Sequence, residues 1–234
     1  WYHLVAEQGK PEAQVNLGVF YASGARRPMI AYMGVDGPPQ DDKKAVRWFR
    51  LAAEQKNASA QFNLGVMCYT GEGVPQDIEE AARWFRQAAE QGKAEAQYNL
   101  GLMYANGKGV PQDYTEALRW LRLAADQGDV DAQYDLGGMY YLGKGVLQDY
   151  TEAMRWYRKA ADQGDAMAQG RLGALYFVGK AVSQDYVQAH MWFNIAVAHG
   201  RKDAAEDRDN LAEKMTPAQI AEAEKLAREW KPKK

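Results

Sequence analysis

Ala96-Gln97-Tyr98-Asn99-Leu100-Gly101 is one of five closely similar hexapeptides in a chain of 234 residues. The other copies begin at positions 13, 60, 132 and 168. Their leucines, at positions 17, 64, 100, 136 and 172, are separated first by 47 residues, including an insertion of 11, and then three times by 36. A period of this length is typical of a solenoid, in which each repeat buries its apolar face only against its neighbours. Such stacks usually work as binding surfaces, so the period also indicates a class of function.

Residues 94–128 show how one repeat is built. Apolar residues at helical spacing predict a first helix, A, over 94–106, which Gly107 ends. Asp113 and Glu116 then form a capping-box pattern that begins a second, antiparallel helix, B, which Gly128 ends. We therefore expect one all-α solenoid over 1–234. Its expected segments are a partial repeat at 1–9, repeats at 12–55, 58–91, 94–127, 130–163 and 166–199, and C-terminal capping helices within 201–230.

Two further positions recur and indicate close packing. Glycine follows the leucine of each hexapeptide in the middle of helix A, where it costs about 1 kcal/mol relative to alanine. Its recurrence at that cost predicts that another helix approaches closely. Tryptophan recurs on helix B, and we expect it to fill the seam between repeats, with a ligand-binding box as the alternative. The tryptophans are Trp48, Trp84, Trp120, Trp156 and Trp192.

The whole repeat carries a family resemblance. The pattern Ala-x-Ala-Gln-x-x-Leu-Gly-x-x-Tyr-x-x-Gly-x-Gly-Val-x-Gln-Asp, followed by Ala-x-x-Trp-x-x-x-Ala-Ala-x-x-Gly, is well matched at 94–128 and 130–164. It resembles the Sel-one-like repeat (SLR) family, a relative of the tetratricopeptide repeats, and covers the chain to about residue 200. The resemblance implies a right-handed α/α superhelix and a role as an adaptor, a scaffold, or a host-interaction or regulatory protein. Many such proteins are bacterial and exported, but the compartment of this chain is left open.

Two departures from that pattern bear on the structure. Cys68 stands where the other repeats have tyrosine, and the pattern places it in the core. Lys56-Asn57 replaces the Gln-Gly that ends helix B elsewhere. One of these two residues must then accept the left-handed backbone conformation, and we expect Asn57, because asparagine tolerates it more easily.

Composition excludes several classes of protein. The formal net charge is -2, so no basic field indicates nucleic acid as a partner. No apolar run approaches the roughly 18 residues that would cross a bilayer. A single cysteine excludes an intrachain disulfide. Because Trp1 to Gly9 matches the second half of a repeat, we expect the chain to have been cut from a longer precursor.

In tetratricopeptide-like stacks helix A lines the concave side, which gives a candidate binding surface. Apolar and aromatic residues with a parallel polar track would suit an extended peptide or a partner helix. The equal alternative is that these side chains pack on one another and fill the groove. The apolar positions are Val15, Val19, Phe62, Val66, Tyr69, Tyr98, Leu102, Tyr134, Tyr141 and Phe177, and the polar track is Asn16, Asn63, Asn99, Asp135 and Arg171.

Two other features invite a functional interpretation. The insertion at 25–35 places Met29, Tyr32 and Met33 in one loop, where an adaptable apolar contact is possible, although a loop folded on the first repeat is favoured. Helix B carries two arginines three residues apart, which resemble a phosphate ladder. Nearby glutamates favour an ion-paired, solvated face instead. The pairs are Arg47/Arg50, Arg83/Arg86, Arg119/Arg122 and Arg155/Arg158.

Catalysis is not expected. His3, His190 and His199 are scattered, and with one cysteine they form no cluster for a metal. We expect neither cofactor nor metal. The sequence predicts a non-catalytic interaction scaffold for a protein or peptide, itself a monomer or weak oligomer. The alternatives are an enzyme or small-molecule binder, such as a recogniser of cell-wall fragments, and an inhibitor or immunity-type protein that blocks one target.

Overall fold

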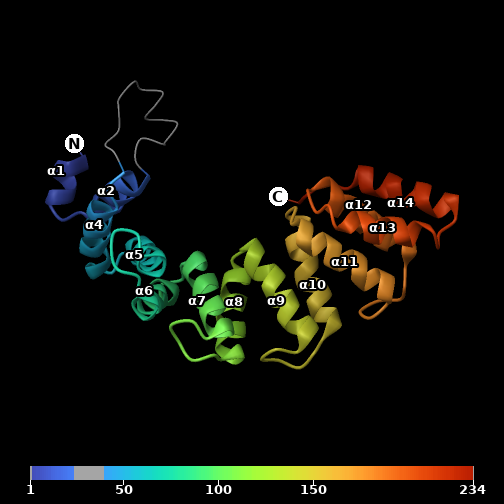
Figure 1. The fold of residues 1–234 in the computed structure, drawn as a ribbon, viewed down its shortest axis with the longest axis horizontal. Coiled ribbons are helices and arrows are strands. Elements are labelled where there is room, and N and C mark those ends of the chain that lie inside the picture. The colour runs from blue at the N-terminus through green and yellow to red at the C-terminus, as the bar shows by residue number, and fades with distance from the viewer. Residues whose placement is uncertain (1, 24–39, 234) are drawn as a thin grey trace, which may run out of the picture. The chain divides into compact units, whose positions relative to one another are not determined.

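The computed structural model describes residues 2–23 and 40–233, and within these ranges it contains thirteen helices and no strand (Figure 1). The predicted all-α fold is confirmed. The insertion at 25–35 lies outside the described residues, so the roles expected of Met29, Tyr32 and Met33 stay predictions.

The chain divides into two compact units, Trp1–Trp120 and Leu121–Lys234. The boundary falls inside helix α8, Tyr114–Asp126. The first unit contains α1 (Tyr2–Glu7), α2 (Pro11–Ser23), α4 (Asp42–Glu54), α5 (Ala58–Thr70), α6 (Ile78–Glu90) and α7 (Ala94–Asn106). The second contains α9 (Val130–Leu142), α10 (Tyr150–Asp162), α11 (Ala166–Val178), α12 (Tyr186–Ala198), α13 (Ala204–Ala212) and α14 (Pro217–Glu229).

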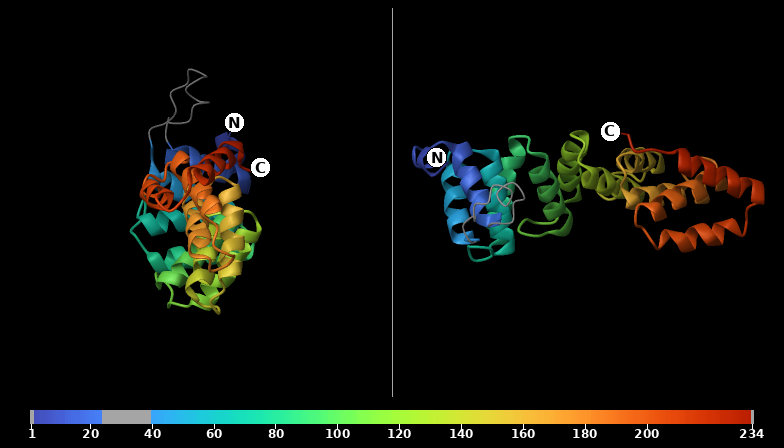
Figure 2. Two further views of the ribbon diagram at one scale, coloured as in Figure 1. Left: turned by 90° about the vertical axis from the view of Figure 1, so that its right-hand side faces the viewer. Right: turned by 90° about the horizontal axis from the view of Figure 1, so that it is seen from above.

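Helical hairpins stack side by side within each unit. In the first, α2 pairs with α4 and α5 with α6, and each B helix packs on the A helix that follows it. In the second, α9 pairs with α10 and α11 with α12, while α13 and α14 both cover α12 (Figure 2). The leucines of the hexapeptides are fully buried between these layers. The stacked hairpins predicted from the period are therefore present.

Polar residues begin and end the helices where the repeat pattern placed them. Asp149 caps α10 by accepting hydrogen bonds from the backbone N–H groups of Thr151 and Glu152 at 2.9 and 3.0 Å. The reciprocal capping box is formed at the start of α14, where Thr216 and Gln219 bond each other's backbone. In the repeats, by contrast, the glutamate of the pattern accepts from a side chain on its own helix: Glu116 accepts from Trp120 at 3.1 Å.

The expectation for Asn57 is wrong. Lys56 takes the left-handed conformation, with a φ of 61°, whereas Asn57 is extended at a φ of -72°. The reason is capping: the Asn57 side chain accepts a hydrogen bond from the Ala60 N–H at 3.0 Å and so begins α5. Lysine has no acceptor for that task, so it occupies the strained position instead.

Close approach explains the glycine in the middle of helix A. A Cβ atom on Gly137 would lie 2.7 Å from a ring carbon of Tyr157 on the paired helix, and one on Gly65 would lie 2.9 Å from Phe85. Real Cβ atoms do not approach other atoms so closely. The glycine therefore allows an aromatic ring of helix B to lie directly on the helix A backbone.

A buried glutamine, whose role the sequence analysis missed, joins consecutive hairpins. Gln133 on α9 donates through Nε2 to the carbonyl of Ala125, near the end of the preceding B helix, at 3.1 Å. Its Oε1 accepts from Gln163, the C-cap of its own B helix, at 2.9 Å. The same donor bond recurs from Gln14 to Ala6, Gln61 to Ala53, Gln97 to Ala89 and Gln169 to Ala161. The signal was present, because this glutamine is in every hexapeptide.

Alanine at Gly137 tests the close approach. We expect Gly137→Ala to lower the free energy of unfolding by about 1–3 kcal/mol through overpacking against Tyr157, more than offsetting its better helix propensity. Gly138→Ala is the matched control, because its Cβ would meet only the Tyr157 hydroxyl, at 3.7 Å. It should stabilise the protein by about 0.5–1 kcal/mol. Urea unfolding followed by circular dichroism measures both, and equal effects of the two substitutions would contradict the steric account.

Methionine at Gln133 tests the amide bridge. Gln133→Met keeps the length of the side chain but leaves the Ala125 carbonyl and the Gln163 amide without this partner. We expect the free energy of unfolding to fall by about 1–3 kcal/mol. Gln148→Met is the control: Gln148 is exposed and donates to Tyr141 at 2.8 Å, a bond that water can replace, so the change should stay within about 0.5 kcal/mol. Similar losses for both variants in the same urea experiment would show that burial of the bridge does not matter.

Candidate partner-binding surfaces

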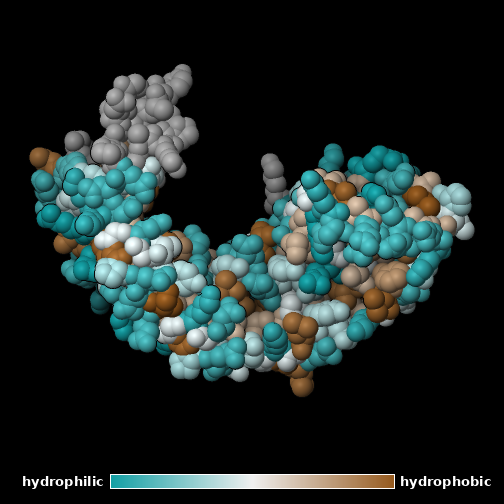
Figure 3. Space-filling model, in the orientation of Figure 1, coloured by the Kyte–Doolittle hydropathy of each residue, from teal (hydrophilic) through white to brown (hydrophobic). Residues whose placement is uncertain are grey.

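The predicted binding residues of the first unit lie on its A helices. Asn16 is exposed and the others are partly exposed, and we call this set the first A-helix surface. Its members are Asn16 on α2, Phe62, Asn63 and Tyr69 on α5, and Tyr98, Asn99 and Leu102 on α7. The space-filling view shows hydrophilic residues over most of the visible face of each unit, broken by small hydrophobic patches (Figure 3). Apolar groups on the visible faces are thus set among polar ones.

Phe62 shows how an aromatic residue of this surface is held. Its ring centroid lies 5.7 Å from that of Phe85 on the paired B helix. The ammonium of Lys93 lies 5.2 Å from the Phe62 centroid, within cation–π range. Lys93 also pairs with Glu95 at 3.1 Å. Phe62 is therefore fixed in position by its neighbours while part of its ring stays accessible.

The asparagine track is partly used within its own helices. Asn63 donates through Nδ2 to the carbonyl of Ser59 at 2.9 Å, and Asn99 donates to that of Glu95 at 2.7 Å. One N–H of each amide is thus committed, which reduces the donors expected to meet a peptide backbone. The bond also orients the amide, so a partner would meet a fixed rather than a rotating group.

The second A-helix surface consists of Tyr134, Asp135 and Tyr141 on α9 with Arg171 and Phe177 on α11. Arg171 donates through Nε to the Tyr134 hydroxyl at 3.4 Å, and this hydrogen bond raises the pKa of the guanidinium, which stays charged. The Tyr134 ring lies 5.6 Å from that of Tyr157, whose pKa is raised by burial. This arrangement brings Tyr134 and Arg171 together from consecutive A helices.

Tyrosines at the start of helix B extend this second surface, and the sequence analysis missed them. Tyr141 lies edge-on to Tyr150 at 5.2 Å, and Lys180 donates to the Tyr150 hydroxyl at 3.2 Å. Phe177 stacks on Tyr186 at 5.9 Å. The signal that could have found Tyr150 and Tyr186 is the Asp-Tyr pair, which recurs at 113–114, 149–150 and 185–186. Packing within the chain therefore buries part of the surface of each predicted aromatic side chain, and each of them stays partly exposed to solvent.

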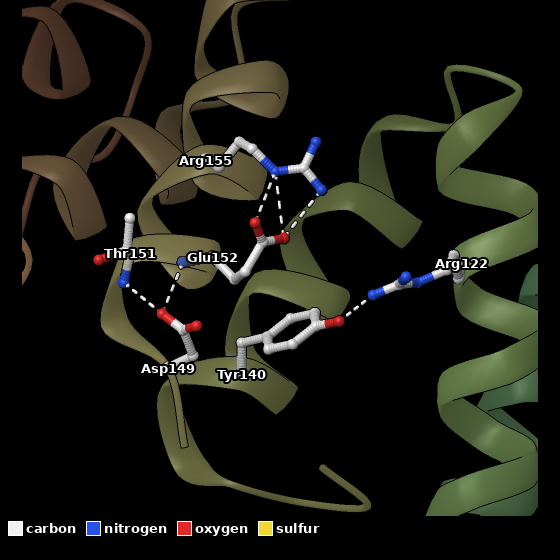
Figure 4. Close-up of polar contacts among 6 residues, drawn as sticks. All are labelled: Arg122, Tyr140, Asp149, Thr151, Glu152 and Arg155. Carbon is white, nitrogen blue, oxygen red and sulfur yellow. Dashed lines mark hydrogen bonds and ion pairs between the residues drawn. The ribbon is translucent and has the colours of Figure 1, made fainter. Parts of the chain in front are cut away.

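The paired arginines of helix B have two different roles (Figure 4). In two of the pairs the first arginine forms an ion pair with the glutamate three residues before it. Arg155 lies 2.8 Å from Glu152, and Arg119 lies 3.2 Å from Glu116. The expected ion pairs are confirmed at these positions. The second arginine donates to a tyrosine of the next A helix, as Arg122 does to Tyr140 (Figure 4). The same contact joins Arg86 to Tyr104 and Arg158 to Tyr176. This second arginine therefore links repeats, which sequence spacing alone did not reveal.

Three of the recurring tryptophans fit the structural interpretation. Trp120, Trp156 and Trp192 are buried, as a residue in a seam between repeats should be, whereas Trp48 and Trp84 are only partly buried. Arg155 and Lys159 lie over the Trp156 ring at 4.5 and 4.0 Å from its centroid. The tryptophans of the second unit thus act as packing elements.

Groups suited to catalysis are sparse in the described part of the chain. No group of three or more His, Cys, Asp or Glu side chains is placed to hold a metal ion within residues 2–23 and 40–233. Cys68 is buried, and burial together with the charge of Glu80 raises the pKa of its thiol to about 11. Among the described helices none is both long and apolar enough to cross a membrane.

The chain was compared with models of known protein families and with curated proteins. The sequence model of the family described as Sel1 repeat matches residues 11–57, 58–93, 94–129, 130–165 and 166–200. A comparison with curated proteins finds no match.

Solved structures resemble the chain over most of its length. The protein c5321, described as a protective antigen present in uropathogenic Escherichia coli strains displaying an SLR fold, is 34% identical with a TM-score of 0.84. The match covers 98% of this chain and 48% of that one, so this chain spans about half the length of that relative. A Sel1 repeat protein from Oxalobacter formigenes is 34% identical with a TM-score of 0.74, over 94% of this chain and 88% of the other. The immunity protein PA5088 from Pseudomonas aeruginosa shares the fold alone, at 18% identity and a TM-score of 0.51 over 92% and 80%.

The reactivity of Cys68 tests its burial. A raised pKa leaves little thiolate at pH 8, so we expect the folded protein to show almost no reaction with a disulfide reagent over minutes. The rate should keep rising as the pH approaches about 11. In guanidinium the unfolded chain should react with one equivalent, because it has one cysteine. Reaction of the folded protein as fast as that of a free cysteine would show that the thiol is accessible.

Proposed function

The chain belongs to the Sel1-repeat family, and from this premise we propose that it holds a peptide or a partner protein on its two A-helix surfaces, without catalysis. Proteins of this family are generally scaffolds for protein interactions. The finer assignment of the binding residues depends on the geometry of the two surfaces.

The observation that carries this proposal is that aromatic side chains are fixed in place yet partly exposed on both surfaces. Phe62 is held between Phe85 and Lys93, and Tyr134 between Tyr157 and Arg171. Aromatic rings give a large contact area, and rings that are already ordered lose little entropy when a partner binds. Such residues are the usual anchors of protein interfaces.

The oriented amides favour a partner in extended or helical form. Asn63 and Asn99 are equivalent positions of consecutive A helices, and each amide is fixed by its own helix. Fixed amides beside fixed rings can bond a peptide backbone while the rings take its side chains. This combination supports a peptide or helix as the ligand more than a small molecule.

Alanine substitutions on the two surfaces test the proposal. The immobilised chain is used to capture its partner from a bacterial lysate, and the affinity of the identified partner is then measured for Phe62→Ala, Tyr134→Ala and the double variant. We expect each single substitution to weaken binding by about 1–2 kcal/mol, roughly 5- to 30-fold.

The control is Leu147→Ala, which removes a side chain that is 89% exposed on a loop of the second unit, outside both surfaces. Thermal melting of every variant checks that the fold is kept. If the folded double variant binds the partner as tightly as the parent chain, the A-helix surfaces are not the binding site. Saturable binding of cell-wall fragments that the two substitutions abolish would instead support the small-molecule alternative.

A further inference from the structure

The segment Trp230–Lys233, after α14, lies without regular secondary structure against the ends of two B helices, α10 and α12. The Trp230 ring lies 5.8 Å from that of Trp192 and 5.5 Å from that of His199, both edge-on. Lys233 donates its backbone N–H to the Asp162 carbonyl at 2.6 Å and pairs its ammonium with the Asp162 carboxylate at 2.8 Å. The second unit thus shows an aromatic residue and a lysine, three positions apart, docked on consecutive B helices.

The first unit has an equivalent groove between its first two B helices, α1 and α4, with a volume of about 540 Å³. The repeat relates the two places residue by residue: Ala6-Glu7-Gln8-Gly9 corresponds to Ala161-Asp162-Gln163-Gly164. By the same alignment Trp48 corresponds to Trp192, Leu51 to Ile195 and Gln55 to His199. Trp48 and Glu7 are therefore the counterparts at the first groove of the Trp192 ring that contacts Trp230 and of the carboxylate that pairs with Lys233, whereas Gln55 replaces the His199 ring.

The lining of the first groove suits a basic, partly apolar ligand. Leu51, which is 37% exposed, and Trp48 give an apolar wall. Glu7 and Glu54 lie beside it, and among the described residues of the lining Arg47 is the one cation, so these described residues carry one net negative charge. An apolar wall is suited to contact an aromatic side chain of a ligand, and the carboxylates are suited to pair with a lysine.

The next B-helix pair, α4 and α6, differs from the first. Between α4 and α6 the position of Leu51 is taken by Gln87, whose Oε1 accepts from the buried Gln61 at 3.0 Å. A polar side chain bonded into the seam gives no apolar wall. The groove between α1 and α4 therefore shares more with the docked site of the second unit than its neighbour does.

We propose that the groove between α1 and α4 docks an extended segment of a partner protein in which an aromatic residue is followed three positions later by a lysine. The aromatic ring packs on Trp48 and Leu51, and the lysine pairs with Glu7. This site lies at the ends of the B helices and is separate from the A-helix surfaces of the proposed function.

A labelled peptide with the sequence of residues 228–234, Arg-Glu-Trp-Lys-Pro-Lys-Lys, is the probe. In the intact chain the second-unit site is already covered by Trp230–Lys233, so the probe reports on the first groove. Fluorescence anisotropy should show saturable binding with one site. Glu7→Lys should weaken that binding at least about fivefold, and Glu54→Lys repeats the test from the other wall. Glu12→Lys makes the same charge change on an exposed residue of α2 outside the groove and should leave the affinity unchanged.

The outcomes separate this proposal from its rivals. A probe with alanine in place of tryptophan should lose binding. Equal weakening by Glu7→Lys and Glu12→Lys would show a general charge effect and overturn the proposal. So would a probe that binds the chain only after residues 230–234 are deleted, because the second-unit site would then be the only one. Phe62→Ala should not affect the probe, so failure of the A-helix surfaces and failure of this groove give different results. Circular dichroism confirms that each variant is folded.

Discussion

The stack depends on the buried glutamine amide that each hexapeptide contributes. Gln169, for example, donates to the Ala161 carbonyl of the preceding B helix at 3.2 Å, and its oxygen contacts the ring nitrogen of His199 at the end of its own B helix at 3.0 Å. A buried amide is stable only when both its donor and its acceptor are used. One side chain therefore ties three helices together and sets how far along its neighbour each hairpin sits. Leucine and alanine supply the apolar layer around the amide, but apolar contacts are not directional and do not fix the position of one hairpin along the next.

Local features were predictable from the sequence because their causes lie a few residues apart. Helix geometry accounts for three such features: the 36-residue period, the mid-helix glycine and the Asp caps. The structure contains the hairpins that they predict. Contacts between repeats were not predictable. Gln133 meets a carbonyl eight residues back and an amide thirty residues on, and Arg122 meets a tyrosine eighteen residues away. Lys56 shows a further limit: the best residue for a left-handed turn was needed for the adjoining cap, and capping prevailed.

The sequence predicted which positions form the candidate site, but not which charged groups lie beside their side chains. Helix periodicity placed Phe62 and Tyr134 on the A helices, whereas the cations beside them come from other segments, such as Lys93 at a helix start and Arg171 on the next A helix. Rings held in this way are ordered before any ligand arrives, which favours affinity. The proposed groove at the ends of α1 and α4 differs in chemistry from these rings, because its lining combines the carboxylates of Glu7 and Glu54 with Trp48 and Leu51.

The repeated hydrogen bonds of the buried glutamines also affect how such a protein changes in length. Gln133, for example, donates one bond to the hairpin behind it and accepts one from its own hairpin, so a whole hairpin can be duplicated or lost without leaving such an amide unmatched. A gain or loss of a few residues inside a helix would separate these partners, whereas the insertion of 11 residues in the first repeat leaves Gln14 bonded to both Ala6 and Gln55. Unequal recombination that exchanges whole repeats should therefore keep every such amide bonded, and a lineage can gain or lose recognition surface in steps of one hairpin.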